Sequence, residues 1–160
     1  MKKTHLVIVT SWLLVAFGLL AFVDKSNNIK TVSFTAKFTT SNEVLQQPPV
    51  IKQKITGTGS SDELSLTKFV ALSTMDRTTA PPFKMEGTCT WYSSDGDTFT
   101  SAFTGKATPS AGGVMTLVIS HTITGGTGKY AHATGTVSGK TIVDPAKLPA
   151  SIDCNGTISW

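Results

Sequence analysis

Charge, cysteine and helical patterning are all scarce in this sequence of 160 residues. Only 15% of the residues are charged, and the basic residues lack the dense clustering on one face that nucleic-acid binding calls for. No CxxC or HxxxH spacing is present, so the sequence lacks the partners for a metal site. Neither a nucleophile elbow nor a Ser-His-Asp or Cys-His set can be assembled. We therefore expect no metal, no cofactor and no nucleic-acid partner.

The one long apolar run lies at the N-terminus. The short basic lead MKKTH precedes LVIVTSWLLVAFGLLAFV, and this order is typical of a secretory signal. A run of about 18 apolar residues is also just long enough to span a bilayer. We expect an exported protein, periplasmic or extracellular, in which residues 1–23 are a signal peptide. The alternative is an uncleaved anchor in the inner membrane formed by residues 6–23, and a polar linker is expected at residues 24–30.

Two cysteines, Cys89 and Cys154, remain after the leader. In an oxidising compartment an isolated pair is most simply a disulfide. Closing a loop of about 66 residues would stabilise the fold by ~4 kcal/mol on the chain-entropy account. The alternative is a pair of buried free thiols, and a reactive pair is the least favoured interpretation.

From Thr31 onward the sequence alternates with a period of two. In TVSFTAKFT the residues Val32, Phe34, Ala36 and Phe38 share one face, which is the pattern of a half-buried strand. Similar runs recur about every ten residues, and the dipeptide Asp95-Gly96 indicates a tight hairpin. Roughly eight strands and no amphipathic helix predict an all-β domain over residues 31–160. Such a pattern indicates an all-β sandwich or barrel, and closure into a barrel would also remove exposed edges.

The stretch TITGGTGKYAHATGTVSG, residues 122–139, is rich in glycine but is not a phosphate loop. Tyr130 follows the lysine where a phosphate loop has Ser or Thr, and no long helix follows. We predict a structural corner in which about one helical turn joins two strands. Tyr130 and Ala131 are expected to plug one end of the barrel. The residues assigned to the corner are Gly125, Gly126, Gly128, Tyr130, Ala131 and Gly135.

The segment TGGTGKYAHATGTVSG resembles the T-G-G-T-G-[RK]-[FY]-A-x-A-x-G segment of the allene oxide cyclase and dirigent-like barrel group, especially its small secreted bacterial members. The DGDT hairpin within Ser94 to Thr98 also recurs in that group. The resemblance spans Met85 to Trp160 and implies an eight-stranded antiparallel barrel with a small internal cavity. Plant cyclases of the group isomerise an unstable epoxide, and dirigent proteins steer radical coupling. None of their polar pocket residues can be matched here, so no activity is carried over.

His121 is the most interesting single residue for chemistry. It shares a strand face with Leu117, Ile119 and Ile123, so it is expected to point into the barrel. An imidazole in an apolar cavity can act as a general base or orient a ligand, while the plainer interpretation is a core histidine with one hydrogen-bond partner. The residues expected to line the cavity are Trp91, Phe99, Phe103, Leu117, Ile119 and His121.

Lys68 is a second, weaker candidate for an acid-base role. The pattern predicts that Leu64, Leu66, Val70 and Leu72 face inward, which places Lys68 in register with the interior. Burial would lower the pKa of such an amine. A bulge in the strand, or an ammonium group reaching solvent at the barrel rim, is the simpler explanation.

These observations favour an exported barrel without enzymatic activity. The expected role is binding of a small hydrophobic ligand or a structural role in the bacterial envelope. The alternatives are an isomerase or lyase acting without a cofactor on a hydrophobic substrate, and an interaction module on an uncleaved anchor. A homo-oligomer is compatible with each of these roles.

Overall fold

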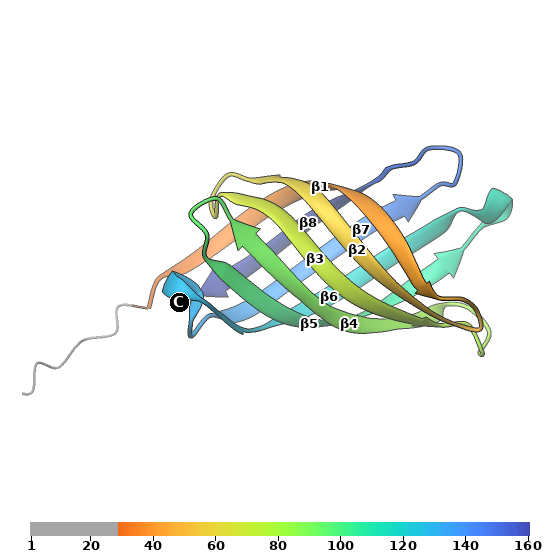
Figure 1. Cartoon of the computed structure of the whole chain (residues 1–160), viewed down its shortest axis with the longest axis horizontal. Helices are drawn as coiled ribbons and strands as arrows, with labels where there is room; N and C mark the ends of the chain where they lie inside the picture. The colour runs from red at the N-terminus through yellow and green to blue at the C-terminus, as the bar shows by residue number, and fades with distance from the viewer. Residues whose placement is uncertain (1–28) are drawn as a thin grey trace, which may run out of the picture.

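The computed structural model describes residues 29–160 as an all-β barrel closed by eight antiparallel strands, which confirms the predicted fold class (Figure 1). The expected leader, residues 1–23, and the linker up to residue 28 lie outside the described residues. Within residues 29–160 no helix has the length and apolar character needed to cross a membrane. The elements are β1 (Thr31–Gln46), β2 (Val50–Ser61), β3 (Leu66–Asp76), β4 (Phe83–Ser93), β5 (Thr98–Pro109), η1 (Ala111–Gly113), β6 (Met115–Gly126), η2 (Gly128–Tyr130), β7 (Thr134–Val143) and β8 (Ala150–Ser159).

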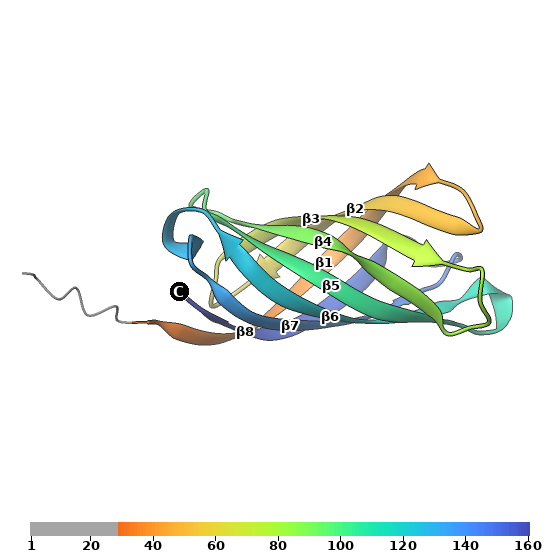
Figure 2. The same cartoon turned by 90° about the horizontal axis from the view of Figure 1, so that it is seen from below.

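The antiparallel order sorts the connections between strands into two ends of the barrel, as both views show (Figures 1 and 2). The closed end holds the start of β1, the end of β8 and the connections 62–65, 94–97 and 127–133. The proline end holds the connections 47–49, 77–82, 110–114 and 144–149. All seven prolines of the chain lie at the proline end, in these connections or at the adjoining strand end. Proline has no N–H to donate, so it is tolerated where the ladders stop.

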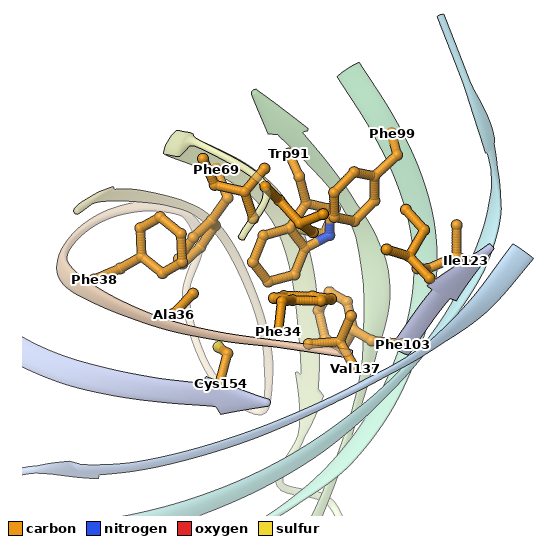
Figure 3. Close-up of a cluster of buried hydrophobic side chains, with 14 of the residues drawn as sticks. Phe34, Ala36, Phe38, Phe69, Trp91, Phe99, Phe103, Ile123, Val137 and Cys154 are labelled. Atoms are coloured by element: carbon orange, nitrogen blue, oxygen red, sulfur yellow. The ribbon is translucent and has the colours of Figure 1, made fainter. Parts of the chain in front are cut away.

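An aromatic cluster fills the half of the interior next to the closed end (Figure 3). The rings of Trp91 and Phe99 stack at 5.6 Å between centroids, and Phe99 meets Tyr130 edge-on at 5.5 Å. A smaller cluster of Met75, Phe83, Met85 and Ala107 lies toward the proline end. Large rings therefore pack one half solidly, and flexible thioethers occupy the other half.

A bulge in β3 overturns the predicted facing of that strand. The register with β4 shifts between Leu66 and Lys68, so the alternation restarts one residue later. Leu64 and Leu66 are buried as expected, but the next inward residues are Phe69 and Ala71. Val70 and Leu72, predicted to point inward, instead face outward because one extra residue reverses the parity of all that follow.

The glycine-rich corner forms as predicted, with one correction. The short helix η2 turns the chain between β6 and β7, and Tyr130 is fully buried at the closed end. Its neighbour in the plug is Ala133, whereas Ala131, which was expected there, is exposed. The tight helical turn separates residues 130 and 133 by one turn, so these two side chains share the inner side.

The corner is tied to the hairpin turn between β4 and β5. The Asp97 carboxylate accepts a hydrogen bond from the backbone N–H of Lys129 at 3.1 Å, and the Lys129 ammonium pairs with Asp95. The bond from Lys129, helped by Ser93 and by the backbone of Asp97, lowers the pKa of the Asp95 carboxyl to about 2. Gly128 has a positive φ of 53°, and a Cβ there would collide with the Asp97 carboxylate. The glycine-rich corner and the hairpin turn at Asp95-Gly96 are therefore in direct contact.

Candidate functional site

An inner cavity of about 50 Å³ is bounded by the aromatic cluster and the methionine cluster. Two of the residues that line it, Ala71 and Cys89, have small side chains. The space remains because the side chains on the facing strands do not fill the volume in front of them. The volume is enough for a few water molecules or one narrow apolar group, and it is well below the roughly 300 Å³ of a pocket for a drug-sized ligand.

Five of the six residues expected at the cavity do line it, namely Trp91, Phe103, Leu117, Ile119 and His121. Phe99 is fully buried in the aromatic cluster instead, packed between Trp91 and Tyr130. Strands β1 and β2 add Thr40, Asn42, Gln53 and Ile55, which were not predicted. The even-numbered, inward positions of β1 continue from Phe38 through Thr40 to Asn42. The alternation of the strand therefore indicates that Thr40 and Asn42 face inward, although their side chains are polar.

His121 ends a buried chain of three polar groups. The indole N–H of Trp91 donates to Ser101 Oγ at 3.1 Å, and Ser101 Oγ lies 3.1 Å from His121 Nδ1. Because the indole can only donate, the serine hydroxyl accepts from Trp91 and is free to donate its own proton to Nδ1. This arrangement is compatible with the tautomer that carries hydrogen on Nε2, although a serine oxygen can also accept from Nδ1–H. Nε2 is the ring nitrogen that remains available to a ligand.

Burial keeps the His121 imidazole neutral. The ring packs against Trp91 at 5.3 Å and Phe103 at 5.1 Å, and no charged side chain lines the cavity beside it. Loss of hydration lowers the pKa of His121 from 6.5 to about 4. At neutral pH the ring is therefore a hydrogen-bonding group without charge.

A mouth groove of about 410 Å³ adjoins the cavity at the proline end. It runs between the end of β1 and the connection from β7 to β8, with Val143, Leu148 and Pro149 among its apolar walls. Thr40, Asn42 and Val143 line both spaces. The inner cavity and the mouth groove therefore share part of their walls.

The mouth groove lies beside the C-terminal stretch of β1, which has a neighbour on one side only; Thr31–Thr35, at the closed end, pairs with β8 alone. β8 begins at Ala150 opposite Thr40, so Ser41–Gln46 pairs with β2 alone. Lys30 and Trp160 exchange both backbone hydrogen bonds, which shows that even-numbered residues of β1 direct their backbone groups toward β8. Asn42 and Val44 therefore present their N–H and C=O groups to the groove.

Lys68 does not reach the interior. The bulge in β3 places its side chain outside, with the ammonium 5.6 Å from the ring centroid of the exposed residue Tyr92. The predicted inward register was wrong, and the bulge named with it as the simpler explanation is present.

Cys89 and Cys154 are free and buried, so the predicted disulfide is absent. They lie on β4 and β8, which are four strands apart in either direction around the closed sheet. A bridge across the barrel would need Cα atoms within about 7 Å of each other. Burial raises the pKa of the Cys89 thiol well above its ordinary value, with a smaller effect of Cys154. Burial also raises the pKa of Cys154 to about 12, with a smaller effect of Asp153.

The chemistry available at the cavity follows from these residues. His121 and Cys89 are the only titratable residues that line it. A thiol that stays protonated is a poor nucleophile, and the neutral imidazole has Ser101 and two aromatic rings as its immediate neighbours. The arrangement can exclude water from an apolar group and orient one polar atom.

No protein-family model, curated protein or solved structure matches this chain. The functional argument therefore rests on the geometry of the inner cavity and the mouth groove.

Proposed function

We propose that this protein binds a small amphiphilic molecule without transforming it. The narrow apolar end of the ligand enters the inner cavity, and its wider or polar part lies in the mouth groove. The observation that carries this proposal is the shared lining of the two spaces by Thr40, Asn42 and Val143, which makes one site of the cavity and the groove. Their volumes, about 50 and 410 Å³, together suit a small ligand.

The walls of the cavity favour an unbranched apolar chain over a ring. The cavity is too small for a fused ring system, but Met85 and Leu117 on its wall have several rotatable bonds. Their movement toward the looser methionine cluster would lengthen the space without disturbing the aromatic cluster.

Two other roles are kept as alternatives. The solid aromatic packing of the closed half favours a purely structural role in the envelope. The neutral imidazole at the cavity wall favours an isomerase without a cofactor, with His121 as the acid-base group. Export to the periplasm or the outside, on the basis of residues 1–23, is part of the proposal in all three cases.

Filling the cavity tests the binding proposal. In the variant Ala71→Leu a larger side chain occupies the space beside Cys89, and binding of unbranched fatty acids measured by calorimetry should weaken at least tenfold. Ala102→Leu, which adds the same atoms at an exposed position of β5, should bind as the natural protein does. Native mass spectrometry of the protein from its own envelope should show a retained ligand and the mature N-terminus. Equal binding by both variants, or no fatty-acid binding at all, contradicts the proposal, and a chemically altered ligand points to the isomerase.

A further inference from the structure

Exposed apolar side chains gather toward the proline end. Among residues 29–160 eight large apolar side chains are exposed, and two of them, Ile29 and Tyr92, lie at the closed end. The other six lie in the half of the barrel next to the proline end, namely Val44, Leu45, Leu72, Val118, Ile142 and Leu148. Val44 and Leu45 at the end of β1 and Leu148 in the connection from β7 to β8 are 51%, 55% and 63% exposed. Apolar side chains exposed toward one end of a protein can mark an interaction surface.

Positive charge gathers in the same half. When the ion pairs of the described residues are set aside, five cations and two carboxylates remain there: Lys52, Arg77, Lys84, Lys106 and Lys140 against Asp76 and Glu86. The half next to the closed end retains Lys30 and Lys68 against Asp62, Glu63 and Asp97. We call Val44, Leu45 and Leu148 the apolar tips. Cations set back from such apolar tips are complementary to a lipid bilayer, which has an apolar interior and can carry anionic headgroups.

We propose that the proline end docks on the surface of an anionic lipid bilayer. Val44, Leu45 and Leu148 enter the boundary between headgroups and acyl chains, while the surrounding lysines and Arg77 lie at the level of the phosphates. Asn42 and Val44, whose backbone groups are free on the groove side, remain within the hydrated headgroup layer, where water satisfies them.

A second copy of the chain fits this surface less well. Two free edges of β1 would pair antiparallel through Asn42 and Val44, because these residues carry the available backbone groups. That register places Glu43 directly opposite Glu43 of the second copy, and like charges in that position destabilise a sheet. The bulge at Leu45 and the prolines that follow further limit such pairing.

Docking by the proline end also gives the ligand a direct route. The mouth groove opens between the β1–β2 hairpin and the connection from β7 to β8, which are the parts that carry Leu45 and Leu148. A lipid chain could pass from the bilayer into the inner cavity without crossing water. This last step, unlike the docking itself, rests on the proposed function.

Sedimentation with lipid vesicles tests the docking. The protein as isolated from its cells should bind vesicles of phosphatidylcholine and phosphatidylglycerol in equal parts more tightly than vesicles of phosphatidylcholine alone, and added salt should remove the difference. Each cation removed from the surface should weaken binding about fivefold. The double variant Lys52→Gln, Lys84→Gln should therefore lose much of the preference for anionic vesicles. The matched double variant Lys30→Gln, Lys68→Gln at the closed end should retain it.

The apolar tips have their own pair of variants. Leu45→Ser with Leu148→Ser should weaken binding to anionic vesicles, and Ile29→Ser with Tyr92→Ser should not. Equal binding to both vesicle types, equal effects of the two lysine pairs, or a dimer in place of vesicle binding would overturn the docking. Ala71→Leu should still bind vesicles. If Ala71→Leu loses fatty-acid binding but still binds vesicles, the two activities are separate. The double variant Lys52→Gln, Lys84→Gln should show the reverse, with weaker vesicle binding and unchanged fatty-acid binding. Failure of the proposed function can therefore be told apart from failure of the docking.

Discussion

The two ends of the barrel close the same eight strands in different ways. At the closed end the ring of Tyr130 packs on Trp160 at 5.2 Å, and the corner is tied to the neighbouring hairpin turn between β4 and β5 through Lys129 and the carboxylates of Asp95 and Asp97. At the proline end the interior holds the smaller cluster of Met75, Phe83, Met85 and Ala107, and the mouth groove lies between the end of β1 and the connection from β7 to β8. One end is built for packing and the other for access.

This division has a physical reason. A plug needs a turn that folds back over the interior, and the glycines of the corner permit that path. The prolines at the opposite end stop the ladders and keep the connections on the rim. Stability and ligand access are thereby assigned to different parts of one small domain.

The largest expected effect comes from the aromatic cluster. Phe99→Ala removes the ring stacked on Trp91 and the edge contact with Tyr130, and it should lower the free energy of unfolding by about 3–5 kcal/mol. Met75→Ala in the methionine cluster should cost less, because that side chain is at the border of burial and flexible neighbours can close the gap. Urea unfolding compares the two, and an equal or larger cost at Met75 would contradict the comparison.

The second expected effect is the dependence of stability on pH, which reports on the cavity between the two ends. His121 has a pKa of about 4 when folded, against 6.5 in the unfolded chain. Between these values the unfolded state binds a proton that the folded state does not, so stability falls as the pH drops from about 6.5 to about 4. The loss should total about 3 kcal/mol.

Substitution separates this titration from others. His121→Asn should abolish the fall between pH 6.5 and 4, measured as the urea midpoint against pH. His132→Asn, at the exposed position in the corner, should leave it unchanged. A fall of the same size in His121→Asn would show that other groups cause it. His121 would then take up its proton as readily in the folded barrel as in the unfolded chain, and the cavity would contain enough water to accept a charged imidazole.

Much of the closed end could be predicted from the sequence, and the reason is local. Alternation of apolar residues in TVSFTAKFT, the Asp95-Gly96 turn and the glycines of residues 125–135 each determine structure within a few residues. Tyr130 was identified as a plug on such grounds. Its partner was misassigned to Ala131 because the exact rotation of a single helical turn depends on contacts distant in sequence.

The errors concern features that only the assembled sheet decides. The bulge between Leu66 and Lys68 arises from the pairing of β3 with β4, and the residue between them gives no sequence signal for a bulge. The prediction of a disulfide was wrong for a similar reason. The number of cysteines cannot show that β4 and β8 lie on opposite walls of the barrel. β8 pairs with β1 only as far as Thr40, which lies opposite Ala150, whereas β1 continues for six more residues to Gln46. The mouth groove lies beside this unpaired side of β1, so it depends on where β8 begins.

The smallest expected effect compares one glycine from each end. Gly112 at the proline end and Gly128 in the corner both have positive φ, 72° and 53°, so alanine should cost about 1 kcal/mol at each from backbone strain alone. A Cβ at Gly112 meets nothing within 4 Å, whereas at Gly128 it collides with the Asp97 carboxylate. Gly128→Ala should therefore cost more than Gly112→Ala in urea unfolding.

Removing the carboxylate isolates the contact between corner and hairpin. In an Asp97→Ala background the excess cost of Gly128→Ala should disappear, because the added methyl group then has room, and the two substitutions should be far from additive. Gly112→Ala should add normally to Asp97→Ala, since no described contact joins the two positions. Additivity for both pairs would mean that the turn and the corner move apart at little cost. The closed end would then be held by its rings alone, and the tie between the two motifs would contribute nothing to the difference between the ends.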